Sequence, residues 1–112
     1  MHVAMLIIFI AVAALFIALA MPLIRNRVPP NNLYGFRTTI TLGDPAIWYP
    51  VNRVAGLWLA ADGVLVAIAA TACYLAPLTP NTASIVNLAV VMLGVLAACV
   101  QGLIVQRRLG KA

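Results

Sequence analysis

Long apolar runs alternate with short polar segments along this chain. Residues 3–24 and 84–105 contain no charged side chain, and residues 54–76 contain one acid. As a helix, a run of this length would extend about 33 Å and cross the roughly 30 Å hydrocarbon core of a bilayer. Lipid also favours helices, because each backbone polar group must be paired within the segment. We therefore predict an all-α integral membrane protein with one domain, residues 1–112, and three transmembrane helices over these ranges.

The first apolar run has a second interpretation, as a secretory signal peptide. Ala18–Leu19–Ala20 is similar to a signal-peptidase cleavage site. However, no Lys or Arg precedes the run, and Arg25 and Arg27 follow it directly. A signal peptide has the opposite order of charge and a shorter apolar core. The pattern favours a retained helix.

The positions of the cations predict how the helices are oriented. The connection 25–53 and the C-terminal tail hold all seven cationic residues: Arg25, Arg27, Arg37, Arg53, Arg107, Arg108 and Lys111. Three spans place all of them on one side of the membrane, which by the positive-inside rule is the cytoplasm. We therefore expect the N-terminus outside and the C-terminus in the cytoplasm.

The composition excludes several classes of protein. With 65% hydrophobic and 8% charged residues and a mean hydropathy of +1.10, the chain does not resemble a soluble domain. The net charge of +5 lies beside the spans and not on a basic face, so we expect no nucleic-acid partner. The cysteines, Cys73 and Cys99, lie inside apolar runs, where we expect small buried side chains and no disulfide.

The chain also has few groups suited to catalysis. It contains one His, one Ser, one Lys and no Glu, and its two acids, Asp44 and Asp62, are far apart. No nucleophile–base pair, acid–base pair or metal cluster can be assembled from these. We expect neither an enzyme nor a cofactor or metal.

Rows of small residues predict close helix packing. Three rows have a spacing of four: Ala14 and Ala18, Gly56 and Ala60, and Gly94, Ala98 and Gly102. Such rows let helix backbones approach closely in membranes, within one chain or between copies. These faces therefore predict either packing within one chain or the formation of homo-oligomers.

The connection 25–53 has its own local signals. Gly35 suits a turn with positive φ, and Asp44–Pro45 is a helix start, with Asp as the cap and Pro at the first position. A helix from there would place Trp48, Asn52 and Gly56 on one face. Pro50 would kink or divide it, so we expect a short interfacial helix that turns into the second span near residues 50–54.

The sequence "PNNLYGFRTTITL", followed by a Trp and "NR", resembles the signature of the SdpI family of small bacterial membrane proteins. The positions that carry this resemblance are Pro30, Asn32, Tyr34, Gly35, Arg37, Thr38, Thr41, Leu42, Trp48, Asn52 and Arg53. Pro50 departs from the pattern, and the family's namesake is longer, with additional spans.

The resemblance implies immunity to a secreted, membrane-active peptide toxin, by binding and not by chemistry. In the family's type system, the immunity protein also holds a transcriptional repressor at the membrane, so a cytoplasmic regulator is a candidate partner beside membrane lipids. Arg37 and Arg53 are the leading site residues, because guanidinium groups bind lipid phosphates and carboxylates. We expect Thr38 and Asn52 to add hydrogen bonds, and Tyr34 and Trp48 to contact a ligand.

Alternatives remain for these residues and for the whole chain. Arg side chains at helix ends also reach toward headgroups, and interfacial aromatic residues form ordinary belts. A lipid-handling or transport module and a small structural subunit of a membrane complex are the other two functions. Asp62, inside the second span, is a candidate functional residue that would hold a proton, contact a toxin helix, or bond to Gln101 or a neighbouring subunit.

Overall fold

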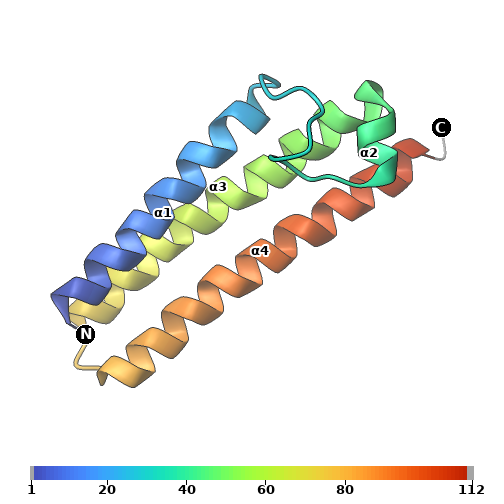
Figure 1. The fold of residues 1–112 in the computed structure, drawn as a ribbon. Helices are drawn as coiled ribbons and strands as arrows, with labels where there is room; N and C mark the ends of the chain where they lie inside the picture. Colours follow the sequence, from blue (N-terminus) through green and yellow to red (C-terminus); the bar gives the residue numbers. More distant parts are fainter. Residues whose placement is uncertain (1, 111–112) are drawn as a thin grey trace.

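The computed structural model describes residues 2–110, and these form three long helices and one short helix. The helices are α1 (Val3–Ile24), α2 (Thr39–Gly43), α3 (Pro45–Leu75) and α4 (Pro80–Gly110) (Figure 1). No strand occurs between residues 2 and 110. Three of the helices, α1, α3 and α4, are long and apolar enough to cross a membrane. The predicted all-α class and three spans are confirmed.

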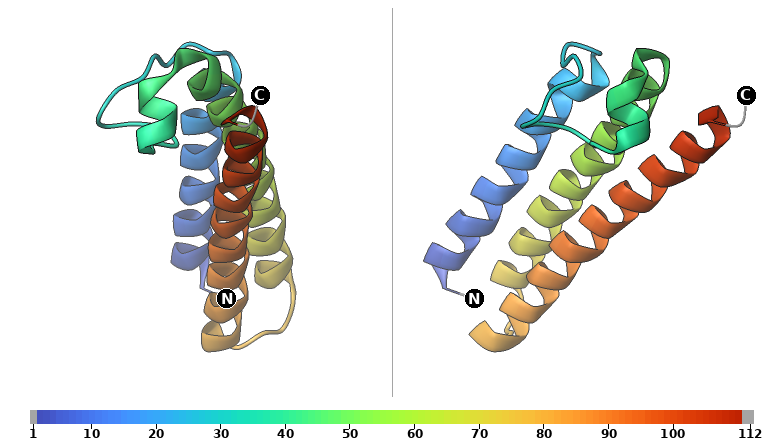
Figure 2. Two further views of the ribbon diagram at one scale, coloured as in Figure 1. Left: turned by 90° about the vertical axis from the view of Figure 1, so that its right-hand side faces the viewer. Right: turned by 45° about the vertical axis from the view of Figure 1, so that its right-hand side comes forward.

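Helix α3 is the centre of the bundle. It packs against α1 on one side and α4 on the other, so the three long helices lie side by side with α3 in the middle (Figure 2). A core of Phe9, Ala13, Val66 and Ala70 joins α1 to α3 in the half that holds the N-terminus. The other half carries α2 and the end of α4, and the polar connection covers it (Figure 1).

Both α3 and α4 are longer than the predicted spans. Each has 31 residues and so reaches about 46 Å, beyond the roughly 30 Å hydrocarbon core. At the α3–α4 connection, α4 begins at Pro80, four residues before the predicted start of its span. At its other end α4 continues to Gly110. With 31 residues each, α3 and α4 are both longer than α1, which has 22 residues.

The predicted division of the helix at Pro50 is wrong. Helix α3 begins at Pro45 as expected, with the Asp44 carboxylate accepting a hydrogen bond from the Ala46 N–H at 2.9 Å, but it runs without interruption to Leu75. Pro50 removes one hydrogen bond, to the Ala46 carbonyl, and both residues are exposed. The short helix of this region is instead α2, which comes before Asp44.

The row of Ala14 and Ala18 does not pack within this chain, so its use between copies stays a prediction, and one cysteine is more exposed than predicted. Ala14 and Ala18 are exposed on α1, and its buried small residues are Ala13 and Ala20. Cys73 is buried as predicted, but Cys99 is exposed; both thiols are free. A helix that is apolar on every side gives no pattern from which its buried face can be read.

The other small residues do mediate helix contacts. A Cβ at position 56 would lie 3.0 Å from Leu23 Cβ and 3.1 Å from the Ala20 carbonyl oxygen, so Gly56 lets α3 approach α1. On the other side of α3, Gly94 of α4 lies against the Asp62 side chain.

Candidate functional site

The candidate site lies at the end of the bundle where the connection between α1 and α3 folds over the helices. Helix α1 ends at Ile24 because Asn26 adopts a left-handed conformation, with φ of 56°. The Asn26 N–H then bonds to the Leu23 carbonyl and the Arg27 N–H to the Pro22 carbonyl, which satisfies the last carbonyls of the helix. The chain leaves α1 here and crosses the bundle toward α4.

Asn52 fastens this connection to α3. Its Oδ1 accepts a hydrogen bond from the Phe36 N–H at 2.5 Å, and its Nδ2 donates to the Phe36 carbonyl at 3.3 Å and to the Trp48 carbonyl at 3.0 Å. The side chain, which is 2% exposed, therefore pairs both backbone groups of one residue in the connection. A buried amide whose oxygen and nitrogen are both hydrogen-bonded stabilises the fold.

Trp48 and Gly35 complete this attachment. The Trp48 ring is fully buried, and its Nε1–H donates to the Val28 carbonyl at 2.7 Å. Gly35 has the predicted positive φ, 114°, and a Cβ there would lie 2.7 Å from Asn52 Oδ1 and 3.2 Å from the Trp48 ring. Glycine is required both for this backbone conformation and for the space. Trp48, Asn52 and Gly56 share one buried face of α3, as predicted.

Thr38 links the connection to α4. Its hydroxyl accepts from the Thr41 N–H at 3.1 Å, and the Thr41 hydroxyl accepts from the Thr38 N–H at 2.7 Å, which makes a reciprocal cap for α2. The Thr38 hydroxyl also lies 2.6 Å from Oε1 of Gln106, a buried residue near the end of α4.

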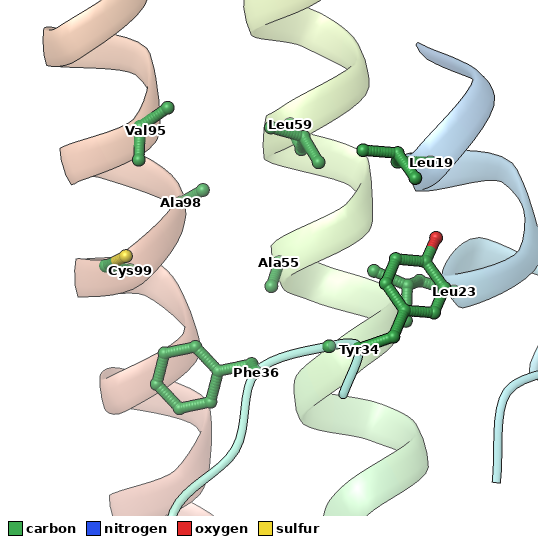
Figure 3. A pocket seen from close by; sticks show the side chains of 10 residues that line it. Leu19, Leu23, Tyr34, Phe36, Ala55, Leu59, Val95, Ala98 and Cys99 are labelled. Carbon is green, nitrogen blue, oxygen red and sulfur yellow. The ribbon is translucent and has the colours of Figure 1, made fainter. Parts of the chain in front are cut away.

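The segment from Tyr34 to Phe36 crosses α3 and places one aromatic ring on each side of it. Figure 3 shows the Tyr34 ring beside Leu23 of α1 and the Phe36 ring beside α4. The Phe36 ring packs on Gly102, where a Cβ would lie 2.9 Å from it.

Beneath this segment is a cavity of about 220 Å³ between the three long helices. Apart from the backbone of the connection, its lining is apolar: Leu19, Leu23, Tyr34, Gly35, Phe36, Ala55, Leu59, Val95, Ala98 and Cys99. The Tyr34 hydroxyl is buried and has no hydrogen-bond partner among residues 2–110. Burial raises the pKa of this phenol above its ordinary value, so Tyr34 is a neutral donor in neutral solution.

Arg37 and Arg53 remain on the surface. Arg37 is exposed, and one of its guanidinium nitrogens donates to the Asn32 carbonyl. Arg53, next to Asn52 on α3, points away from the buried face and is exposed. The arginines lie in the connection after α1, near the start of α3 and in the last turn of α4: Arg25, Arg27, Arg37, Arg53, Arg107 and Arg108. These segments meet at the end of the bundle that carries α2 (Figure 1).

The predicted site residues thus fall into two groups. The side chains of Thr38, Trp48 and Asn52 tie the connection to the helices. In contrast, Arg37 and Arg53 are exposed, and the Tyr34 hydroxyl is buried without a hydrogen-bond partner among residues 2–110. The structure does not join Asn52 and Thr38 to a cluster with the two arginines. Tyr49, on the same turn of α3 as Arg53, is half-buried.

Sequence reasoning did not single out three residues that build this site. Asn31 accepts from the N–H groups of Leu33 and Tyr34 at 2.9 and 2.7 Å and so shapes the turn before Gly35. Its position after a Pro pair was a usable signal, since Asn favours such side-chain turns. Phe36 and Gln106 gave no comparable signal, because their partners are far away in the sequence.

Asp62 lies apart from this site, in the middle of α3. Its side chain is 2% exposed, it points at Gly94 of α4, and neither carboxyl oxygen has a hydrogen-bond partner among residues 2–110. The predicted hydrogen bond to Gln101 is therefore not formed.

These features define a class: a small membrane protein of three helices whose polar connection is folded tightly over one end of the bundle. The model of the SdpI/YfhL protein family matches residues 27–105, which include this connection, α3 and most of α4. The chain belongs to the SdpI/YfhL family. No significant match was found among curated proteins or among solved structures.

Proposed function

We propose that this protein protects its cell against a secreted, membrane-active peptide toxin, or senses such a peptide, by binding it without chemical catalysis. The observation that carries the proposal is the conjunction of family membership with the site at the α2 end of the bundle. There, Arg37 and Arg53 are exposed and an apolar cavity lies beneath the connection. Tyr34 lines this cavity, and its buried hydroxyl has no hydrogen-bond partner among residues 2–110.

The chemistry of this end suits an amphipathic peptide at a membrane surface. The cavity accommodates an apolar side chain, and the Tyr34 hydroxyl offers one hydrogen bond to a carbonyl in that environment. The exposed guanidinium groups at this end of the bundle would bind a carboxylate of the peptide or a lipid phosphate beside it. By the positive-inside rule, this arginine-bearing end faces the cytoplasm of the bacterial cell, and a cytoplasmic regulator would bind here.

The test is survival of a toxin-sensitive bacterium that expresses this chain and is challenged with a peptide toxin of the kind the family's type member resists. Arg37→Gln/Arg53→Gln is the variant, and Arg25→Gln/Arg27→Gln is the matched control, since it removes the same charge from the same end of the bundle. Membrane levels of each protein are measured by immunoblot. We expect protection by the parent chain and the control, and loss of protection in the variant.

Protection that persists in Arg37→Gln/Arg53→Gln at equal membrane levels would contradict the role of these arginines. Absence of protection by the parent chain would contradict immunity to that peptide. A stable partner protein recovered in mild detergent, together with absence of protection, would favour a structural subunit instead.

Binding of an anionic lipid is the second candidate function, favoured by the six arginines at one end of the bundle above an apolar cavity. It predicts that an anionic phospholipid copurifies with the protein and is detected by native mass spectrometry. Arg37→Gln/Arg53→Gln should reduce its occupancy more than Arg25→Gln/Arg27→Gln does. Equal occupancy in both variants would indicate ordinary headgroup contacts.

A further inference from the structure

We propose that Asp62 and the pocket around it form a second site, between α3 and α4, which binds a lipophilic cation such as an organic ammonium or phosphonium ion. The inference is independent of toxin immunity, because it uses other residues at a different level of the bundle.

The first step concerns the charge of Asp62. An ionisable side chain inside a membrane span is costly, and such residues usually face a partner or a ligand. Asp62 is 2% exposed, and both carboxyl oxygens are buried without a hydrogen-bond partner among residues 2–110. Arg53, the nearest cation along α3, is nine residues away, about 13 Å along the helix. The described chain supplies no countercharge at this level, so the carboxyl is stable there as the neutral acid. A cation from outside would be the countercharge that favours loss of its proton.

The second step concerns space. A pocket of about 350 Å³ lies beside Asp62 between α3 and α4, with a lining of small or apolar residues: Trp58, Ala61, Asp62, Leu65, Val90, Leu93, Gly94 and Ala97. Asp62 is the only charged member of this lining. Leu65 and Leu93 are more than half exposed on the lipid-facing surface, so an occupant can enter from the bilayer. An apolar body with a single positive charge matches these walls.

The third step concerns Trp58. It lies one helical turn before Asp62, on the same side of α3, and it is 42% exposed at the pocket. An indole face attracts organic cations, and this attraction strengthens where water is excluded. Carboxylate and indole together therefore select for positive charge in a pocket that otherwise selects only for apolar surface.

Other occupants fit less well. A bare metal ion needs several oxygen, nitrogen or sulfur ligands, and no group of three such residues occurs among residues 2–110. A second copy of this chain offers no cation, because residues 54–76 and 84–105 contain neither Lys nor Arg. A neutral lipid chain would fill the space but offer the carboxyl group neither a charge nor a hydrogen bond.

The experiment measures binding of tetraphenylphosphonium to the purified chain in nanodiscs of uncharged lipid, by equilibrium dialysis of the radiolabelled ion. Asp62→Asn keeps the shape of the side chain and removes its charge. Asp44→Asn is the matched control, because it is the same substitution in the other acid of the chain, at an exposed cap where Asn serves equally well. Tetraphenylborate, an anion of the same shape, tests whether charge decides binding.

We expect saturable binding of tetraphenylphosphonium to the parent chain and to Asp44→Asn. Affinity should fall by about tenfold or more in Asp62→Asn, as for loss of a buried charge partner. It should fall by roughly three- to thirtyfold in Trp58→Leu, the range of a cation–π contact. Tetraphenylborate should not bind saturably.

Three results would overturn the proposal. The first is equal affinity in the parent chain and Asp62→Asn, and the second is equal binding of tetraphenylborate. The third is absence of saturable binding, including the case in which crosslinking shows the pocket covered by a second copy.

Discussion

Asn52 and Asp62 lie ten residues apart on the same helix and are equally buried, at 2% exposed, but their surroundings differ completely. The Asn52 amide makes three hydrogen bonds to backbone groups of Phe36 and Trp48. The Asp62 carboxyl makes none within residues 2–110. A buried polar group that is fully bonded stabilises one structure, whereas a buried polar group without partners costs stability and is suited to a ligand.

The largest effect is expected for Asn52→Ala. The substitution leaves the Phe36 N–H without its partner and removes one of the two hydrogen bonds to the Phe36 carbonyl, which keeps the one from the Thr41 hydroxyl. It should lower the free energy of unfolding by about 2–4 kcal/mol. Arg53→Ala is the control, since it changes the exposed neighbouring position. Both are measured by denaturant unfolding in the same detergent. Equal losses in the two variants would contradict the structural role of Asn52.

A somewhat smaller loss is expected for Gly35→Ala. The backbone has a positive φ, and the added Cβ would lie 2.7 Å from Asn52 Oδ1, so we expect a cost of about 1–3 kcal/mol. Gly43→Ala tests the specificity of this effect, because a Cβ at position 43 meets no atom within 4 Å. If both variants unfold alike, the close contact between Gly35 and Asn52 is not a constraint.

Features set by local sequence could be predicted, whereas contacts between distant residues could not. Three spans, the cap at Asp44 and the shared face of Trp48, Asn52 and Gly56 follow from length, turn chemistry and helical spacing, and the structure confirms them. The bond from Thr38 to Gln106 joins residues 68 positions apart, and no local pattern predicts such a contact. In α1, uniform apolarity left the buried face undetermined, so Ala13 was missed.

Gly94→Ala tests the packing around Asp62. A Cβ at position 94 would overlap the Asp62 carboxyl group, so the helices must shift, at a cost of about 1–2 kcal/mol. The double variant Gly94→Ala/Asp62→Ala should recover most of this loss, because the overlapping group is gone. Strictly additive losses in a double-mutant cycle would show that the two positions do not interact.

The smallest effect on stability is expected for Tyr34→Phe. The hydroxyl has no partner among residues 2–110, so its removal should change the free energy of unfolding by less than about 0.5 kcal/mol. If the hydroxyl contacts a bound peptide, protection from toxin should nevertheless fall. A loss of stability of more than about 1 kcal/mol would instead indicate that the hydroxyl has a structural partner.

Tyr34 also predicts a dependence on alkaline pH. Because burial raises the pKa of this phenol in the folded state, the folded protein holds the proton at a pH where the unfolded chain has released it. The contribution of the protonated phenol to the stability of the fold is fully present below its ordinary pKa of 10.0, and it is lost as the pH rises through the higher pKa of the folded state. Absorbance titration should therefore show one late phenol in the parent chain that is absent in Tyr34→Phe. Identical titration curves after scaling for tyrosine number would contradict this.

The most direct measurement compares the free energies of unfolding of Asn52→Ala and Asp62→Ala in the same detergent. The account predicts a loss of about 2–4 kcal/mol for Asn52→Ala and either no loss or a gain for Asp62→Ala, since that substitution removes an unpaired buried carboxyl. A loss in Asp62→Ala as large as that in Asn52→Ala would mean that Asp62 stabilises the fold, and would contradict its assignment as a ligand site.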